Sequence, residues 1–325
     1  MTKHIAYFDF LRGIAILMVI GIHTFPSASW DKPNDVLLIA IRQILNCAVP
    51  IFIALSAYFI ANKKFDTSKD IFSFLKKQIP KVYIPCLFWS MPYLIIEYIQ
   101  WGNILKHVVY FFFCGYSIYY FIALIIQFYL LTPLLVKINK IGGVISIIIS
   151  VLSISLYVYS DLQLPLILYA GPFIMWIMFY VQGIYISRMN RNYSYWVLLM
   201  VLLLCIFLQI IESKYLFTLT GRGFGIKASA YIYSTVAIFL LFSQRLQYMY
   251  ESKKHFMKRF IEYIGQISFG IYLIHMFVVS LVSKYFDIHN WIINWGIVLV
   301  FTILIIQILK AIFPAKITGK YLGIL

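Results

Sequence analysis

The sequence carries little charge and few acidic residues. Only 12% of its 325 residues are charged, and only 11 are Asp or Glu, whereas a soluble domain averages about 25% charged residues. This scarcity excludes an ordinary soluble enzyme. The four cysteines lack C-x-x-C spacing, so the sequence predicts neither a metal site nor a disulfide framework. The zinc motif H-E-x-x-H and glycine-rich nucleotide signatures are also missing, so no resident cofactor is expected.

Apolar residues are abundant instead. They make up 63% of the chain, aromatic residues make up 19%, and the mean hydropathy is +0.89. Apolar runs of about 20 residues recur along the whole chain, and each is long enough to cross a bilayer. The sequence therefore predicts an all-α fold, a polytopic transmembrane helical bundle of about ten spans.

The expected spans occupy most of the chain. They are residues 5–25, 36–61, 82–100, 119–136, 141–160, 166–187, 193–211, 230–243, 263–282 and 291–314. Residues 1–325 are expected to form a single membrane-embedded domain with no appended soluble domain. The lysine-rich residues 62–81 are expected to form a loop, and the aromatic residues 101–118 an amphipathic segment at the membrane interface.

The net charge of +16 comes from 27 Lys and Arg residues, most of which flank the expected spans on one side. The densest group, six lysines, lies within residues 62–81. This asymmetry is the positive-inside pattern, so both termini are expected in the cytoplasm of a multi-pass cell-membrane protein. Orientation and attraction to anionic lipid headgroups explain the charge without a nucleic-acid partner.

Three ionisable side chains interrupt the first apolar run. Arg12 and His23 are eleven positions apart, about three helical turns, so they share one helix face and lie about 16 Å apart along its axis. Asp9 precedes Arg12 by three residues, within reach of an ion pair. Ionisable groups inside a span are costly and usually functional, so this face is expected to line a passage.

The same run resembles a family signature. The sequence Phe-Asp-Phe-Leu-Arg-Gly-Ile-Ala of residues 8–15, followed by His23, is similar to the opening of the acyltransferase-3 family. The hallmark of that family is an Arg and a His separated by ten residues in the first span. Its members are integral membrane acyltransferases, and many of them O-acetylate cell-surface polysaccharides or lipid-linked glycans.

Further similarities to this family follow in order along the chain. Residues 49–59 are similar to a motif ending in Ser-Gly-Tyr, with Ala57 in place of the glycine. Residues 120–133 look like the fourth-span pattern, and residues 265–275 match the late signature, which ends at His275. One departure stands out, because residues 76–81 carry lysines where the family often has two arginines. Lysine cannot make a bidentate phosphate contact.

The resemblance implies transfer of an acyl group, most often acetyl, from cytoplasmic acetyl-CoA to a hydroxyl of a cell-envelope polysaccharide or lipid-linked glycan. Such chemistry needs a base for the hydroxyl, and His23 suits that role because its usual pKa lies near neutral pH. His23 also suits transient acyl transfer, and the sequence does not separate the two roles. A structural histidine bonded between helices is the alternative.

Two more charged residues are expected at the depth of His23. Arg42 enters from the outer side in the second span, and Glu97 lies near the outer end of the third. Within the implied reaction, Arg42 is expected to stabilise the oxyanion, and Glu97 to orient His23 or neutralise Arg42. A simple Arg42–Glu97 pair that offsets two buried charges is the alternative.

The donor is expected to bind at the other end of the first span. Arg12 would meet coenzyme A, with Asp9 holding its guanidinium, and Lys77 and Lys81 would attract the phosphates as point charges. A structural Asp9–Arg12 pair and ordinary topogenic lysines are the alternatives. Arg222, in a glycine-rich external loop, is the candidate for acceptor binding.

His275 follows Tyr272 by three residues, so the two share a helix face, and they are interpreted as packing or lining residues. A transporter or exporter of a glycan or lipid-linked precursor is the alternative function, since polar groups along a span suit transport too. The lack of internal repeats and the single Arg–His span favour the enzyme.

Overall fold

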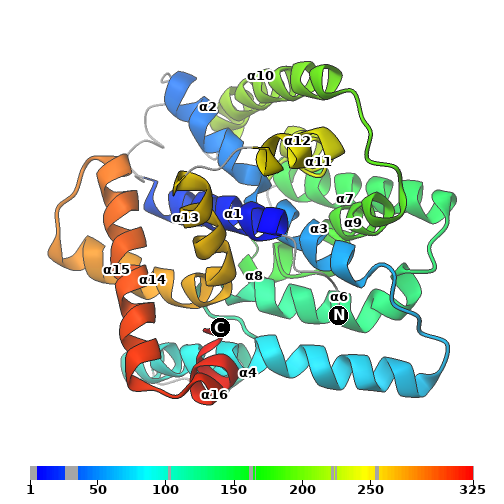
Figure 1. Cartoon of the computed structure of the whole chain (residues 1–325). Helices are drawn as coiled ribbons and strands as arrows, with labels where there is room; N and C mark the ends of the chain where they lie inside the picture. The colour runs from blue at the N-terminus through cyan, green and yellow to red at the C-terminus, as the bar shows by residue number, and fades with distance from the viewer. Residues whose placement is uncertain are drawn as a thin grey trace.

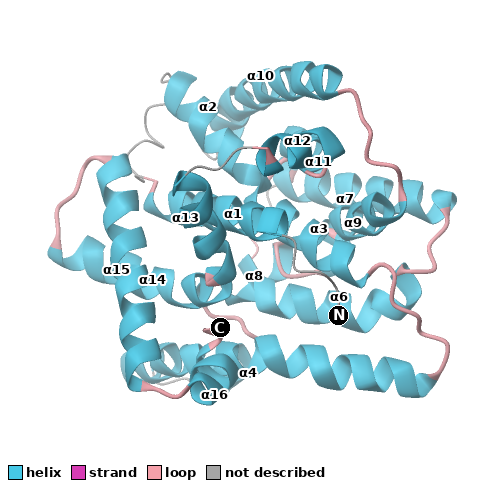
Figure 2. Ribbon diagram, in the orientation of Figure 1, coloured by secondary structure: helices cyan, strands magenta, loops and turns pink. Residues whose placement is uncertain are grey.

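A computed structural model describes residues 6–25, 36–101, 104–160, 164, 166–220, 223, 225–252 and 256–324. These residues form helices joined by loops, without a strand among them (Figure 2). The longer helices are α1 (Ala6–Thr24), α3 (Ala48–Ile60), α4 (Ser68–Trp101), α6 (Tyr120–Leu135), α7 (Lys140–Tyr159), α10 (Tyr195–Thr220), α11 (Ala228–Leu241), α14 (Ser268–Tyr285) and α15 (Trp291–Ile312). The shorter ones are α2 (Val36–Ile44), α5 (Ile104–Phe112), α8 (Leu166–Tyr169), α9 (Ile177–Arg188), α12 (Gln244–Glu251), α13 (Phe256–Gln266) and α16 (Ala315–Ile317).

Eight helical stretches of the described chain are long and apolar enough to cross a membrane. They overlap eight of the ten expected spans and confirm a polytopic helical bundle. The two others are shorter. Residues 166–188 are divided into α8 and α9 around Gly171 and Pro172, since proline lacks the amide that continues a helix. Helix α11 has 14 residues.

The loop expected over residues 62–81 is wrong from Ser68 onward, because α4 begins there and continues through Pro80, Pro85 and Pro92. Its start is fixed by a reciprocal cap. The backbone amide of Thr67 donates to the Asp70 carboxylate over 2.9 Å, and the Asp70 amide donates to the Thr67 hydroxyl over 3.2 Å. The lysine-rich segment is therefore mostly helical and continuous with the third span.

Helix α1 lies in the middle of the bundle, where it contacts α3, α13, α14 and α15 (Figure 1). Its closest neighbour is α13, which crosses it at two glycines. A methyl group on Gly265 would overlap the carbonyl oxygen of Asp9, and one on Gly13 would overlap that of Ile261. The expected span at residues 263–282 is divided between α13 and α14 at Ile267, so α13 turns onto α1 instead of continuing the span.

Candidate active site

Arg12 and Asp9 form the ion pair that their spacing predicts. Nη1 of Arg12 lies 2.6 Å from Oδ1 of Asp9, whose side chain is only 4% exposed, while that of Arg12 is 35% exposed. The guanidinium also lies over the ring of Phe59 on α3, 5.1 Å from its centroid. Asp9 and Phe59 thus hold Arg12 in place while part of its guanidinium stays accessible.

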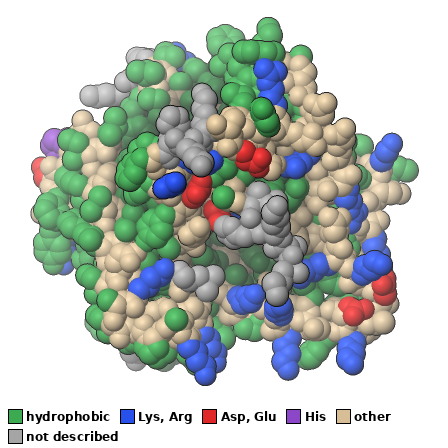
Figure 3. Space-filling model, in the orientation of Figure 1, with side chains coloured by type: hydrophobic (Ala, Val, Ile, Leu, Met, Phe, Trp, Pro, Cys, Tyr) green, Lys and Arg blue, Asp and Glu red, His purple; other side chains and the backbone are tan. Residues whose placement is uncertain are grey.

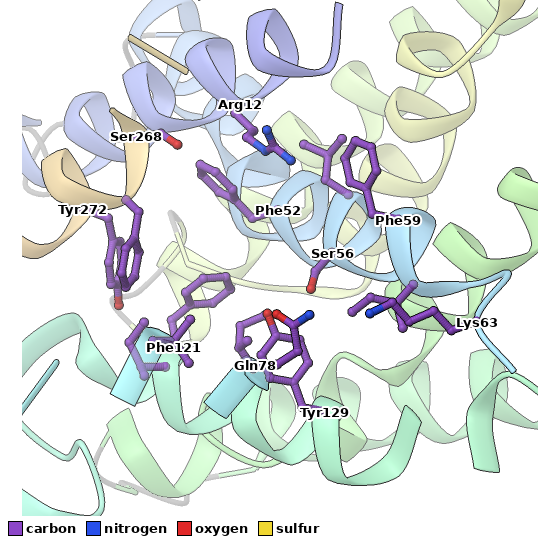
Figure 4. Close-up of a pocket in the computed structure, with 16 residues that line it drawn as sticks. Arg12, Phe52, Ser56, Phe59, Lys63, Gln78, Phe121, Tyr129, Ser268 and Tyr272 are labelled. Atoms are coloured by element: carbon purple, nitrogen blue, oxygen red, sulfur yellow. The ribbon is translucent and has the colours of Figure 1, made fainter. Parts of the chain in front are cut away.

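The accessible side of Arg12 faces a cavity of about 400 Å³, called here the Arg12 cavity (Figure 4). Helices α1, α3, α4, α6 and α14 line it. Its polar lining residues are Arg12, Ser56, Lys63, Gln78, Tyr129 and Ser268, and the others are apolar or aromatic. A cavity of this size and mixed lining suits a ligand that has both apolar and polar parts.

Lysines surround one end of the Arg12 cavity. Lys63 lines it, whereas the exposed Lys77 and Lys81 lie on the adjacent face of α4, next to the face that presents Gln78 and Val82 to the cavity. Partial burial lowers the pKa of Lys63, and the charges of Lys77 and Lys81 lower it further. Figure 3 shows this basic surface at the lower right, over the start of α4. An anion bound there would relieve the repulsion among the three lysines.

His23 lines a second cavity, of about 130 Å³, called here the His23 cavity. Arg42, on α2, lines it too and is almost fully buried. Nη1 of Arg42 donates to Oδ1 of Asn46 over 2.7 Å, which fixes the direction of the guanidinium. The structure therefore brings the half-buried His23 and Arg42, from separate helices, to one small cavity whose other walls are mostly apolar and aromatic.

A buried polar network that sequence reasoning missed lies behind Arg42. Nδ2 of Asn46 donates to Oε1 of Gln43 over 2.8 Å, and Nζ of Lys227 donates to the same oxygen over 2.5 Å. Lys227 also donates to the carbonyl oxygen of Gly223 over 3.0 Å and has no exposed surface. Gln43 and Asn46 were recognisable as polar residues in an apolar run, but nothing in the sequence connects them with Lys227, because it lies 184 residues after Gln43.

His275 lies beside His23. The centroids of the two imidazole rings are 5.4 Å apart, and the His275 side chain is completely buried. The sequence interpretation of His275 as a packing or lining residue did not place it next to the candidate base. The two positions are 252 residues apart, and only the packing of α14 against α1 brings them together.

The two cavities meet at three aromatic side chains. Phe52, Phe121 and Tyr272 line both cavities, and we call this trio the aromatic partition. The ring centroids of Phe52 and Phe121 are 6.3 Å apart, and those of Phe121 and Tyr272 are 5.6 Å apart. The Tyr272 hydroxyl donates to the carbonyl oxygen of Ile118, which anchors that ring. In Figure 4 the three rings lie at the end of the Arg12 cavity opposite Lys63.

Two predicted site residues are not placed by the structure. The side chain of Glu97 and the whole of Arg222 lie outside the described residues. Their expected roles beside His23 and at the acceptor stay predictions, as do the catalytic and binding roles of the other candidates.

Arg12 lines one cavity and His23 lines the other, and both side chains belong to α1. Residues 5–311 match the acyltransferase domain family, acyltransferase-3. The chain belongs to this family and is a membrane acyltransferase, which favours the enzyme over the transporter alternative. No curated protein and no solved structure matches the chain.

Proposed function

We propose that this chain transfers an acetyl group from acetyl-CoA to a hydroxyl of a cell-envelope polysaccharide or lipid-linked glycan. The observation that carries the proposal is the pair of cavities that share the aromatic partition, with Arg12 in one and His23 in the other. The two residues lie on the same helix, so a long arm bound at Arg12 can present its end to His23 once the aromatic rings move aside.

The Arg12 cavity is proposed as the donor site. Coenzyme A is a polyanion with a long, largely uncharged arm that ends in the thioester. Lys63, Lys77 and Lys81 supply the positive field for the phosphates, and the apolar and aromatic walls accept the arm. The lysines would lie in the cytoplasm of a cell-membrane protein, together with both termini.

The His23 cavity is proposed as the reaction site. The unprotonated ring nitrogen of His23 takes the proton of the acceptor hydroxyl while the hydroxyl oxygen attacks the thioester carbonyl carbon. Arg42 stabilises the oxyanion, since its guanidinium is already oriented by Asn46. As the tetrahedral intermediate collapses, the carbon–sulfur bond breaks, and the sulfur of coenzyme A receives the proton from His23. Trp176, Phe121 and Tyr120 in the same cavity offer flat faces for a sugar ring.

The test is transfer of labelled acetyl from acetyl-CoA to envelope glycans in membranes that contain the protein. His23→Ala is expected to lower transfer at least about 100-fold, because it removes the base. The matched control, His289→Ala, changes an exposed histidine in the loop after α14 and is expected to leave transfer unchanged.

If wild type and His23→Ala labelled the glycans equally, His23 would have no part in the reaction. Wild-type label no higher than in membranes without the protein would overturn the proposed donor and acceptor. If acetyl-histidine were trapped at position 23 in the absence of acceptor, His23 would act as a transient carrier of the acetyl group and not as the base.

A further inference from the structure

The protonation pattern of the His275 ring is set by its own helix. Nδ1 lies 3.0 Å from the carbonyl oxygen of Ile271 and 2.9 Å from that of Tyr272. Carbonyl oxygens only accept hydrogen bonds, so Nδ1 carries the hydrogen and donates it. In the neutral ring Nε2 is then an acceptor. This atom is buried and has no hydrogen-bond partner among the described residues.

A buried acceptor without a partner is costly, and His23 is the neighbouring group that can supply a donor. Ring nitrogens lie roughly 1 Å from the ring centroid, so at a centroid separation of 5.4 Å two facing nitrogens come to about the 3 Å of a hydrogen bond. His23 lines a cavity and has room to turn, whereas His275 is held at Nδ1. Catalytic hydrogen bonds are often loose in the free enzyme and tighten when substrate binds.

We propose that His275 is a positioning residue that fixes the tautomer of His23. Nε2 of His275 accepts a hydrogen bond from one ring N–H of His23, so that the other nitrogen of His23 is unprotonated and faces Arg42 across the cavity. This inference rests on the proposed function of His23 as the base.

The proton balance of the reaction is unchanged by this contact. The free nitrogen of His23 gains the proton of the acceptor hydroxyl and later gives it to the departing sulfur. The N–H that points at His275 stays on His23 throughout, and its hydrogen bond strengthens while the ring is an imidazolium. His275 therefore stabilises the charged intermediate through this hydrogen bond, while the proton itself stays on His23.

The kinetic test compares two replacements of similar length. His275→Met removes the acceptor, and we expect kcat to fall about 10- to 100-fold, the effect of losing one buried hydrogen bond to a charged group, with KM for acetyl-CoA unchanged. His275→Gln places an amide oxygen near the position of Nε2, and we expect it to restore most of kcat. Tyr119→Phe is the control, since it removes a different buried hydrogen bond to α14, from the Tyr119 hydroxyl to the Leu273 carbonyl oxygen. We expect near wild-type kcat for it. Equal losses of kcat in the Met and Gln variants, or wild-type kcat in the Met variant, would overturn the proposal.

A second measurement determines the tautomer of His23 directly and does not depend on acetyl transfer. The protein is labelled with ¹⁵N-histidine in bilayers, and the ring signals of His23 are identified by their loss in His23→Ala. We expect a single neutral tautomer of His23 in the wild type and a mixture of two in His275→Met. The same single tautomer in both would overturn the positioning role, even if acetyl transfer were absent. Absent transfer with the expected spectra would instead count against the proposed function alone.

Discussion

Lys63 reaches the Arg12 cavity because it lies just after the end of a helix. It follows α3, lines the Arg12 cavity, and lies with its ammonium 4.9 Å from the ring centroid of Phe74 on α4. The Arg12–Asp9 pair was predictable from a spacing of three residues. Lys63 was not, because its position depends on where α3 ends and on how the chain turns back onto α4.

Replacing Lys63 tests the donor site. Lys63→Gln is expected to raise KM for acetyl-CoA about five- to tenfold with little change in kcat, since a contact to a charged phosphate is lost but the reacting groups are not touched. The measurement is initial rate against acetyl-CoA concentration. Lys64→Gln is the matched control, because the neighbouring Lys64 is exposed and does not line the cavity. A similar rise of KM in both variants would mean that general charge, and not the cavity, attracts the donor.

The contact between helices α1 and α13 positions the Asp9–Arg12 end of the site. Asp9 and Arg12 lie on the turn of α1 that Gly265 contacts, so the distance between these helices sets where the guanidinium lies. The sequence predicted most spans because a run of about 20 apolar residues is a strong signal. Its third span already ran through Pro85 and Pro92, but it did not predict that the helix begins at Ser68 and continues through Pro80. Neighbouring helices in a membrane can satisfy the backbone groups that a proline leaves free. Nor did the sequence predict the break at Ile267, which depends on α13 packing against a glycine of α1.

Alanine substitutions at two glycines distinguish the effect of close helix packing on stability from the effect of helix propensity. Gly265→Ala is expected to destabilise the protein by about 1–3 kcal/mol, because the added methyl group meets the backbone of α1 and the helices must separate. Gly296→Ala on α15 places its methyl group in open space and is expected to be neutral or slightly stabilising. Thermal unfolding of the purified variants checks both. An unchanged midpoint for Gly265→Ala would show that α13 can move away from α1 at little cost.

The whole molecule is expected to keep its two cavities on opposite sides of the membrane. The charge pattern of the sequence predicts this orientation, with the lysine-rich start of α4 inside and the loop after α14 outside. The cavities themselves were not predictable, because each is lined by residues from several helices that are distant in the sequence. Their meeting at the aromatic partition depends on the packing of α3, α6 and α14.

Cysteine labelling checks the orientation. Lys69→Cys, at the start of α4, is expected to react with a membrane-impermeant maleimide only after the cells are opened, whereas His289→Cys is expected to react in intact cells. Both positions are exposed. The four native cysteines are buried, so little background label is expected from them. Labelling of Lys69→Cys in intact cells at the level of His289→Cys would refute the topology, because both positions would then lie outside.

The aromatic partition also has an electrical consequence. In the proposed reaction one acetyl group passes Phe52, Phe121 and Tyr272 in one direction, and one proton returns from the acceptor hydroxyl to the sulfur of coenzyme A. The polyanionic part of the donor stays beside the lysines. The exchange moves no net charge through the bilayer, whereas each uncompensated charge would cost or gain about 2.3 kcal/mol per 100 mV. The membrane voltage would then neither drive nor oppose acetylation, and the cell could modify its surface without drawing on its ion gradients.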